Sequence, residues 1–228
     1  MLRNLTLRLR AAASAHPLRA IAVGATTSQA IHRRNVIRNI YLVPAVLYRD
    51  RLRKMKGRNH NMPATKTATT MFPTHIDLPE SDREPLIELL NGRLADTADL
   101  YSQIKQAHWN VKGPTFFQLH LLFDQLAAEV FPYIDLIAER ATALGGVAMG
   151  TARMAAASSH LPEYPIEATE GQRHLKALID RYAVFTTNIR KAIDIADEHH
   201  DKSTADIFTE ISRTADKQLW FLEAHVQH

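Results

Sequence analysis

The sequence predicts an all-α fold, a bundle of four long helices that follows a basic N-terminal segment. Apolar residues recur at helical spacing in four stretches between residue 81 and the C-terminus. Gly113-Pro114 separates the first two stretches, because glycine commonly ends a helix and proline commonly begins one. Residues 145–168 are rich in small residues, contain two prolines and separate the middle stretches. A connection of that length can join parallel neighbours in a four-helix bundle, so we predict a long crossover.

The first helix is predicted over 81–108. Ser81 is suited to cap its N-terminus, Glu84 completes a capping box three residues later, and Pro85 is tolerated in the first turns. The core stripe follows at helical spacing: Leu86, Leu89, Leu90, Leu94, Ala98, Tyr101 and Ile104. Residues 62–80 are rich in threonine, proline and alanine, which indicates a flexible or extended lead-in.

The second helix is predicted over 115–144, where Gly145-Gly146 ends it. Its expected core stripe is Phe116, Leu119, Phe123, Leu126 and Val130. Pro132 lies inside this helix, removes one backbone hydrogen bond and can kink the chain. A kink at this position would change the direction of two acidic side chains that follow, Asp135 and Glu139.

The remaining elements complete one domain over 81–228. A short helix is expected near 153–157, within the crossover. The third long helix should begin at residue 169 or 170 and reach 198, and the fourth should span 203–226. No run of eighteen apolar residues occurs, so no membrane span is expected.

Two histidines and two carboxylates are candidate metal ligands. His108 and His120 each lie about six residues from the Gly113-Pro114 turn, and a rise of ~1.5 Å per residue places both at the same height on facing helices. Asp135 and Glu139 are four residues apart, so both project from one helix face as oxygen ligands for a hard or borderline cation. The structural alternative is a pair of surface histidines and a solvated acidic face with salt bridges to arginine.

The spacing of these two pairs sets a constraint. His120 and Asp135 are fifteen residues apart, which is roughly 22 Å along a straight helix. Ligands of one ion must lie within a few ångströms of it. The pairs therefore belong to separate sites, or a neighbouring subunit supplies the carboxylates across a symmetric interface.

Composition limits the metal chemistry. The chain has no cysteine, which excludes disulfides, thiolate zinc sites and cysteine-ligated iron–sulfur clusters. Twelve histidines and 24 acidic residues remain, a ligand set that suits iron, zinc or manganese.

Positive charge is concentrated at the N-terminus. Residues 1–61 contain thirteen arginines and lysines and one acid, a net charge of +12, whereas residues 62–228 carry fifteen bases and 23 acids, a net charge of −8. Translation could start at Met62, the segment could be an organelle transit peptide, or it could be a DNA-binding arm that neutralises phosphates. We expect a cytoplasmic protein, associated with the nucleoid in the third case, with organelle import open in the second.

Two sequence motifs closely resemble those of the Dps family, ferritin-like DNA-binding proteins from starved cells. The first is H-W-N-V-K-G, five residues, Leu119-His120, three residues and Asp124. The second is I-D-L-I-A-E-R over 134–140, followed by Leu144-Gly145-Gly146 and Ala148. The similarity continues through TADIFTEISRTADKQLWFLEAH and covers about residues 74–225.

The resemblance implies a ferritin-like subunit that assembles into a hollow dodecamer with a ferroxidase site at each two-fold interface. It implies that His108 and His120 of one subunit and Asp135 and Glu139 of the other bind iron, with Trp109 beside the iron and Asp124 as a nearby carboxylate. Hydrogen peroxide is the expected oxidant. Four acids near the third turn between long helices, Asp194, Asp197, Asp201 and Asp206, could line an iron-entry pore or form a solvated loop.

The sequence therefore leaves three alternative predictions of function. The first is a ferroxidase and iron-storage cage that protects DNA from oxidative damage. The second is a DNA-condensing nucleoid protein in which iron oxidation is secondary. The third is a degenerate cage in which Pro132 has displaced the carboxylates. The absence of any Glu-x-x-His spacing excludes the usual iron centre within a single bundle.

Overall fold

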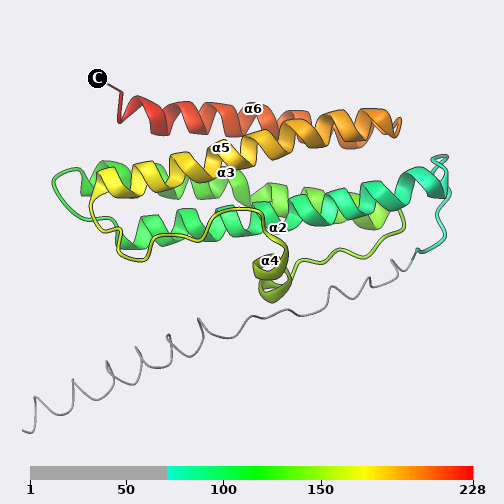
Figure 1. Cartoon of the computed structure of the whole chain (residues 1–228), viewed down its shortest axis with the longest axis horizontal. Coiled ribbons are helices and arrows are strands. Elements are labelled where there is room, and N and C mark those ends of the chain that lie inside the picture. The colour runs from blue at the N-terminus through cyan, green and yellow to red at the C-terminus, as the bar shows by residue number, and fades with distance from the viewer. Residues whose placement is uncertain (1–70, 228) are drawn as a thin grey trace, which may run out of the picture. The chain divides into compact units, whose positions relative to one another are not determined.

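The computed structural model describes residues 71–227, so the basic segment 1–61 and most of the lead-in lie outside the described residues. The described part contains five helices and no named strand: α2 (Glu80–Asn110), α3 (Phe116–Ala143), α4 (Ala152–Ser158), α5 (Gly171–Glu198) and α6 (Lys202–Ala224). The axes of the four long helices lie roughly along one line, and α4 lies outside them against α2 (Figure 1). This arrangement confirms the predicted all-α four-helix bundle.

Helix α2 begins differently from the prediction. Its N-cap is Pro79, with no side-chain cap, and the Pro79 carbonyl accepts hydrogen bonds from the backbone N–H groups of Asp82 and Arg83 at 3.0 Å. The Ser81–Glu84 capping box is therefore wrong. The ring of Pro79 sterically keeps the preceding residue, Leu78, out of helical conformation, so the helix cannot extend further back along the chain. Acidic Glu80 in the first turn suits the positive end of the helix dipole.

The predicted turn between the first two helices is confirmed. Gly113 has a φ of +107°, a backbone conformation that glycine adopts without strain, and its carbonyl accepts the N–H of Phe116 at 3.0 Å. Thr115 is the N-cap of α3. Helices α2 and α3 consequently pack along each other as a hairpin.

Helix α3 continues through Pro132 as one element of 28 residues, so the proline does not end it. After α3, Gly145 has a φ of +90°, and its carbonyl accepts the backbone N–H of Phe72 at 2.7 Å. Arg83 donates to the Leu144 carbonyl at 2.8 Å. The end of α3 is thus fastened to the start of α2 and to the extended segment before it.

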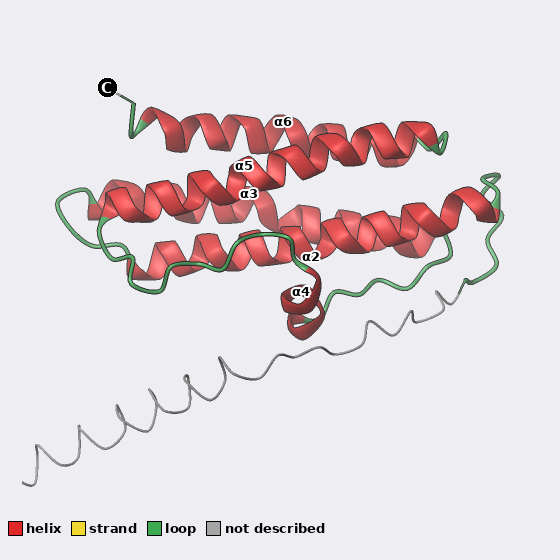
Figure 2. Cartoon of the chain, in the orientation of Figure 1, coloured by secondary structure: helices red, strands yellow, loops and turns green. Residues whose placement is uncertain are grey.

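The crossover runs from the end of α3 to the start of α5 as loop, interrupted by α4 (Figure 2). The short helix confirms the expectation near 153–157, and Thr151 caps it by accepting the Met154 N–H at 3.3 Å. Leu161 turns into the core from this connection. Arg181 of α5 also holds the crossover, since it donates to the Glu163 carbonyl and to Gln103 of α2.

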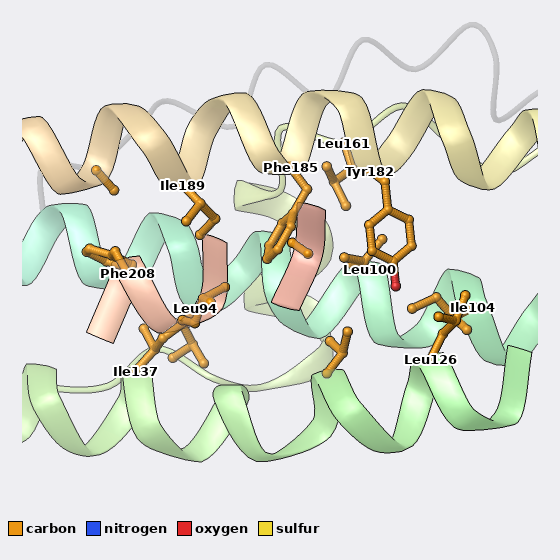
Figure 3. Close-up of a cluster of buried hydrophobic side chains, with 14 of the residues drawn as sticks. Leu94, Leu100, Ile104, Leu126, Ile137, Leu161, Tyr182, Phe185, Ile189 and Phe208 are labelled. Atoms are coloured by element: carbon orange, nitrogen blue, oxygen red, sulfur yellow. The ribbon is translucent and has the colours of Figure 1, made fainter. Parts of the chain in front are cut away.

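The core lies between the four long helices. Figure 3 shows side chains from all of them and from the crossover directed toward one another: Leu94, Leu100 and Ile104 of α2, Leu126 and Ile137 of α3, Tyr182, Phe185 and Ile189 of α5, Phe208 of α6, and Leu161. The Tyr182 hydroxyl in this core donates to the Gln218 side chain at 2.8 Å. None of the helices within residues 71–227 is long and apolar enough to cross a membrane.

Candidate metal centre

His108 and His120 lie side by side at the α2–α3 hairpin. His108 is two residues from the end of α2, and His120 is in the second turn of α3. Their rings stack with centroids 3.8 Å apart and planes inclined by 22°. The Nδ1 atom of His108 lies 2.8 Å from the His120 backbone carbonyl, and the Nδ1 atom of His120 lies 2.9 Å from the His108 carbonyl.

These reciprocal contacts fix the protonation pattern of both rings. A carbonyl oxygen only accepts hydrogen bonds, so each Nδ1 must carry the proton and donate. In the neutral imidazole the other nitrogen, Nε2, then holds a free lone pair. A histidine whose Nδ1–H is bonded to a carbonyl and whose Nε2 is free is oriented as metal-binding histidines usually are. The hairpin therefore presents two neighbouring nitrogen atoms that could bind a metal ion.

Asp124 is the carboxylate nearest to this pair. Its Oδ1 lies 3.9 Å from the Nε2 atom of His108 and 2.6 Å from the Lys105 ammonium. The hydrogen bond from Lys105 is the main cause that lowers the pKa of Asp124, and the two histidines add to the shift. Asp124 is therefore ionised and positioned beside the free nitrogen of His108.

Trp109 points away from the protein and is 67% exposed. The Lys105 ammonium lies 5.9 Å from the centre of its ring. The ring of Phe116 lies 5.1 Å from that of His120. Exposed aromatic side chains thus flank the histidines, as expected for a site that another surface would cover.

Asp135 and Glu139 are both exposed on α3 and remain apart from the histidines. Because α3 is continuous from His120 to Glu139, the separation of roughly 22 Å between the histidine and the aspartate applies along this helix. Arg140 is bonded to Asp201 and not to Glu139. Within residues 71–227 of one subunit, no three histidine, aspartate or glutamate side chains come together as a metal site.

Asp135 borders a shallow depression of about 520 Å³. The depression lies between α2, α3 and the crossover and is lined otherwise by apolar residues: Leu94, Phe131, Pro132, Ile134, Ala138 and Gly150. Pro132 forms part of this wall one turn before Asp135. Asp135 therefore lies next to an apolar surface, and the described residues of its own chain form no group of three metal-binding side chains around it.

Sequence reasoning missed three residues around the histidines. Lys105 lies three residues before His108, so the helical spacing could have placed it on the same face. Tyr164 and His174 form a hydrogen-bonded pair against the hairpin, with the tyrosine oxygen 2.6 Å from the histidine Nδ1. This contact joins the crossover to α5, and no local pattern signals it.

Comparisons with known proteins agree with this architecture. Residues 87–228 match the family model described as a ferritin-like domain. The chain is therefore a ferritin-like protein.

The relatives define the family more closely. The "DNA protection during starvation protein" of Agrobacterium fabrum is 47% identical over 154 residues, which cover 68% of this chain and 95% of the relative. The structure of DpsC from Streptomyces coelicolor is similar with a TM-score of 0.67 and 34% identity, over 70% of this chain and 93% of that one. The chain belongs to the Dps family.

A third comparison concerns the type of metal site. The Dps protein from Vibrio cholerae O1 has a TM-score of 0.65 and 25% identity, over 69% of this chain and 98% of that one. That protein is described as a member of a broad superfamily of ferritin-like diiron-carboxylate proteins.

Proposed function

We propose that this protein oxidises Fe(II) at sites shared between two subunits and stores the ferric product inside a dodecameric cage. His108 and His120 of one subunit supply two nitrogen ligands, and Asp135 and Glu139 of the partner subunit supply the oxygen ligands. The observation that carries the proposal is the reciprocal hydrogen bonding of the two rings, which leaves both Nε2 atoms free. The separation of the carboxylates along the same helix supports an intersubunit site.

The ligand set favours oxidation of the bound ion. Carboxylates are hard anionic ligands, so they stabilise Fe(III) more than Fe(II). Two neutral imidazoles and two carboxylates leave coordination positions open for an oxidant, for which we propose hydrogen peroxide. Consumption of Fe(II) and peroxide together would suppress hydroxyl-radical formation and so protect DNA. Asp124 adds a negative charge beside His108 and would attract the incoming cation.

The test is the rate of Fe(II) oxidation by peroxide, followed in a stopped-flow spectrophotometer by the absorbance of the ferric product. The double variant His108→Ala, His120→Ala should oxidise Fe(II) no faster than buffer does. A matched control replaces two exposed histidines outside the site, His75→Ala and His225→Ala, and should keep the wild-type rate. Equal rates in all three proteins would leave no role for the histidine pair.

A second candidate function is DNA binding through residues 1–61. The net charge of +12 in this segment is the observation that favours it, because basic segments bind duplexes by neutralising phosphates. The relative from Agrobacterium fabrum carries DNA protection in its name. An intact N-terminal segment would place the protein in the cytoplasm in association with the nucleoid.

A further inference from the structure

Tyr164, which is half-buried, and His174, which is buried, form a hydrogen-bonded pair at the start of α5. Tyr164 lies in the crossover, His174 in the first turn of α5, and their oxygen and Nδ1 atoms are 2.6 Å apart. His174 is fully buried, and this burial lowers its pKa, so the ring is neutral near neutral pH. Burial raises the pKa of Tyr164, so its hydroxyl keeps its proton.

The second nitrogen of His174 is buried as well. Its Nε2 has no hydrogen-bond partner among the described residues. With the phenolic hydroxyl protonated and the imidazole neutral, Nδ1 can accept the phenolic hydrogen of Tyr164.

The pair is connected to both helices that carry the proposed nitrogen ligands. Asn110, whose backbone raises the pKa of His174, is two residues from His108 in α2. The ring of His174 contacts Phe123, with centroids 6.3 Å apart, and Phe123 is one helical turn from His120. The Lys112 N–H also donates to the Thr169 carbonyl at 2.8 Å and holds the start of α5 against the hairpin. Gly171 permits this approach, since a Cβ there would lie 2.5 Å from Leu119.

We propose that Tyr164 is a reversible one-electron donor to the iron site, with His174 as the base that holds its proton. This proposal rests on the proposed ferroxidase function and deepens it. Peroxide accepts two electrons, whereas one Fe(II) supplies one. A nearby phenol that supplies the second electron would prevent release of a hydroxyl radical when a single ion is bound.

The two steps balance in atoms and electrons. In the first, one Fe(II), one hydrogen peroxide and the Tyr164–His174 pair give one Fe(III), two hydroxide ions, a neutral tyrosyl radical and a protonated His174. The O–O bond of peroxide breaks, and the phenolic proton moves to Nδ1. In the second, another Fe(II) reduces the radical, and His174 returns the proton. The sum is two Fe(II) and one peroxide giving two Fe(III) and two hydroxides.

The surrounding charges favour Tyr164 over Trp109 as the donor. The Arg181 guanidinium lies 5.5 Å from the Tyr164 ring, where it disfavours a cationic radical, but the phenol loses its proton with its electron and stays neutral. Trp109 faces Lys105, and an indole that loses an electron first becomes a cation beside that ammonium. The Asn110 carbonyl would stabilise the transiently protonated His174.

The test is rapid-freeze electron paramagnetic resonance after the whole protein, loaded with one Fe(II) per site, is mixed with peroxide. Wild type should show a tyrosyl radical whose splitting collapses when the protein contains ring-deuterated tyrosine. The signal should be lost in Tyr164→Phe, which keeps the ring, and retained in Tyr133→Phe, which loses a half-buried hydroxyl bonded to Thr214. Spin trapping should detect several-fold more hydroxyl radical from Tyr164→Phe.

The role of His174 is tested by His174→Gln, whose amide oxygen can accept the hydrogen bond but not the proton. Its radical yield should fall while thermal unfolding stays cooperative. An unchanged signal in Tyr164→Phe, a signal lost only in Trp109→Phe, or no protein radical in wild type would overturn the proposal while leaving ferroxidase activity intact. Equal Fe(II) oxidation with and without the His108–His120 pair would instead overturn the proposed function.

Discussion

Arg140 of α3 holds the carboxylate of Asp201 in a two-pronged ion pair, with distances of 2.7 and 2.8 Å from one guanidinium nitrogen to the two oxygens. Asp201 is buried at the corner between α5 and α6, where it also caps α6 by accepting the Thr204 N–H at 3.0 Å. One carboxylate thus fastens the second helical hairpin to the first. Because it is buried and paired, it is not part of a solvated loop.

Removal of this carboxylate should destabilise the fold. We expect Asp201→Ala to lower the free energy of unfolding by roughly 3 kcal/mol, because it leaves Arg140 without its partner and α6 without its cap. Urea unfolding followed by circular dichroism measures the change. Asp194→Ala removes an exposed acid from α5 and should alter stability by no more than about 0.5 kcal/mol. Similar losses in both variants would contradict a special role for Asp201.

The same residue predicts a pH dependence. Burial raises the pKa of Asp201, but hydrogen bonds from Arg140 and Thr204 outweigh burial and lower the pKa overall. The ionised carboxylate therefore stabilises the fold above its unfolded-state pKa, and this contribution is lost as the pH falls toward the depressed folded-state value. As the pH falls from the unfolded-state pKa of Asp201 to its lower folded-state pKa, wild type should lose stability faster than Asp201→Asn does. Parallel pH profiles for the two proteins would count against this assignment.

Gly145 and Gly92 make a matched pair of glycines. Gly145 has a φ of +90°, and a Cβ there would lie 2.5 Å from the Phe72 carbonyl oxygen, so Gly145→Ala should cost roughly 1–3 kcal/mol. Gly92 is inside α2 with nothing within 4 Å of an added Cβ, so Gly92→Ala should stabilise by about 0.5–1 kcal/mol. Thermal unfolding should shift in opposite directions. A shift in the same direction would contradict the backbone argument.

Sites shared between subunits predict complementation between two inactive variants. His108→Ala, His120→Ala lacks the nitrogen ligands, and Asp135→Asn, Glu139→Gln lacks the oxygen ligands. When equal amounts assemble at random, half of the interfaces pair unlike subunits and each regains one intact site, so about a quarter of the sites should recover. Ferroxidase activity of co-expressed protein measures this. Mixtures that stay as inactive as either parent would exclude the shared site.

The N-terminal segment predicts a salt-dependent interaction with DNA. The full chain should retard a duplex in a gel and lose affinity steeply as salt rises, because bound counterions are displaced from phosphates. A chain that begins at Met62 carries a net charge of −8 and should not bind. Equal retardation of both chains would assign DNA binding to the helical body.

The sequence predicted the helices well because apolar spacing and Gly113-Pro114 act locally. It failed at the start of α2, where the backbone restriction imposed by Pro79 prevailed over the Ser81–Glu84 pattern. The height of His108 and His120 followed from counting residues, but the rotation of their rings did not.

The other features that the sequence did not predict depend on contacts between residues far apart in the chain. The environment of Asp201 depends on Arg140, which is 61 residues away in the chain. The bond between Tyr164 and His174 depends on the path of an irregular crossover over α5. Neither contact has a periodic signal in the sequence, so only the assembled bundle reveals it.

The cross-bonding of His108 and His120 has a consequence for the lengths of loops in this protein. Each ring is anchored to the main chain of the other residue, so both bonds close only for one register of α2 against α3. An inserted residue between Val111 and Thr115 would lengthen the short turn that sets this register and so break both bonds together. An insertion in the exposed stretch 147–150 would leave this register unchanged. Natural variation in length should therefore accumulate in the crossover and be absent from the hairpin.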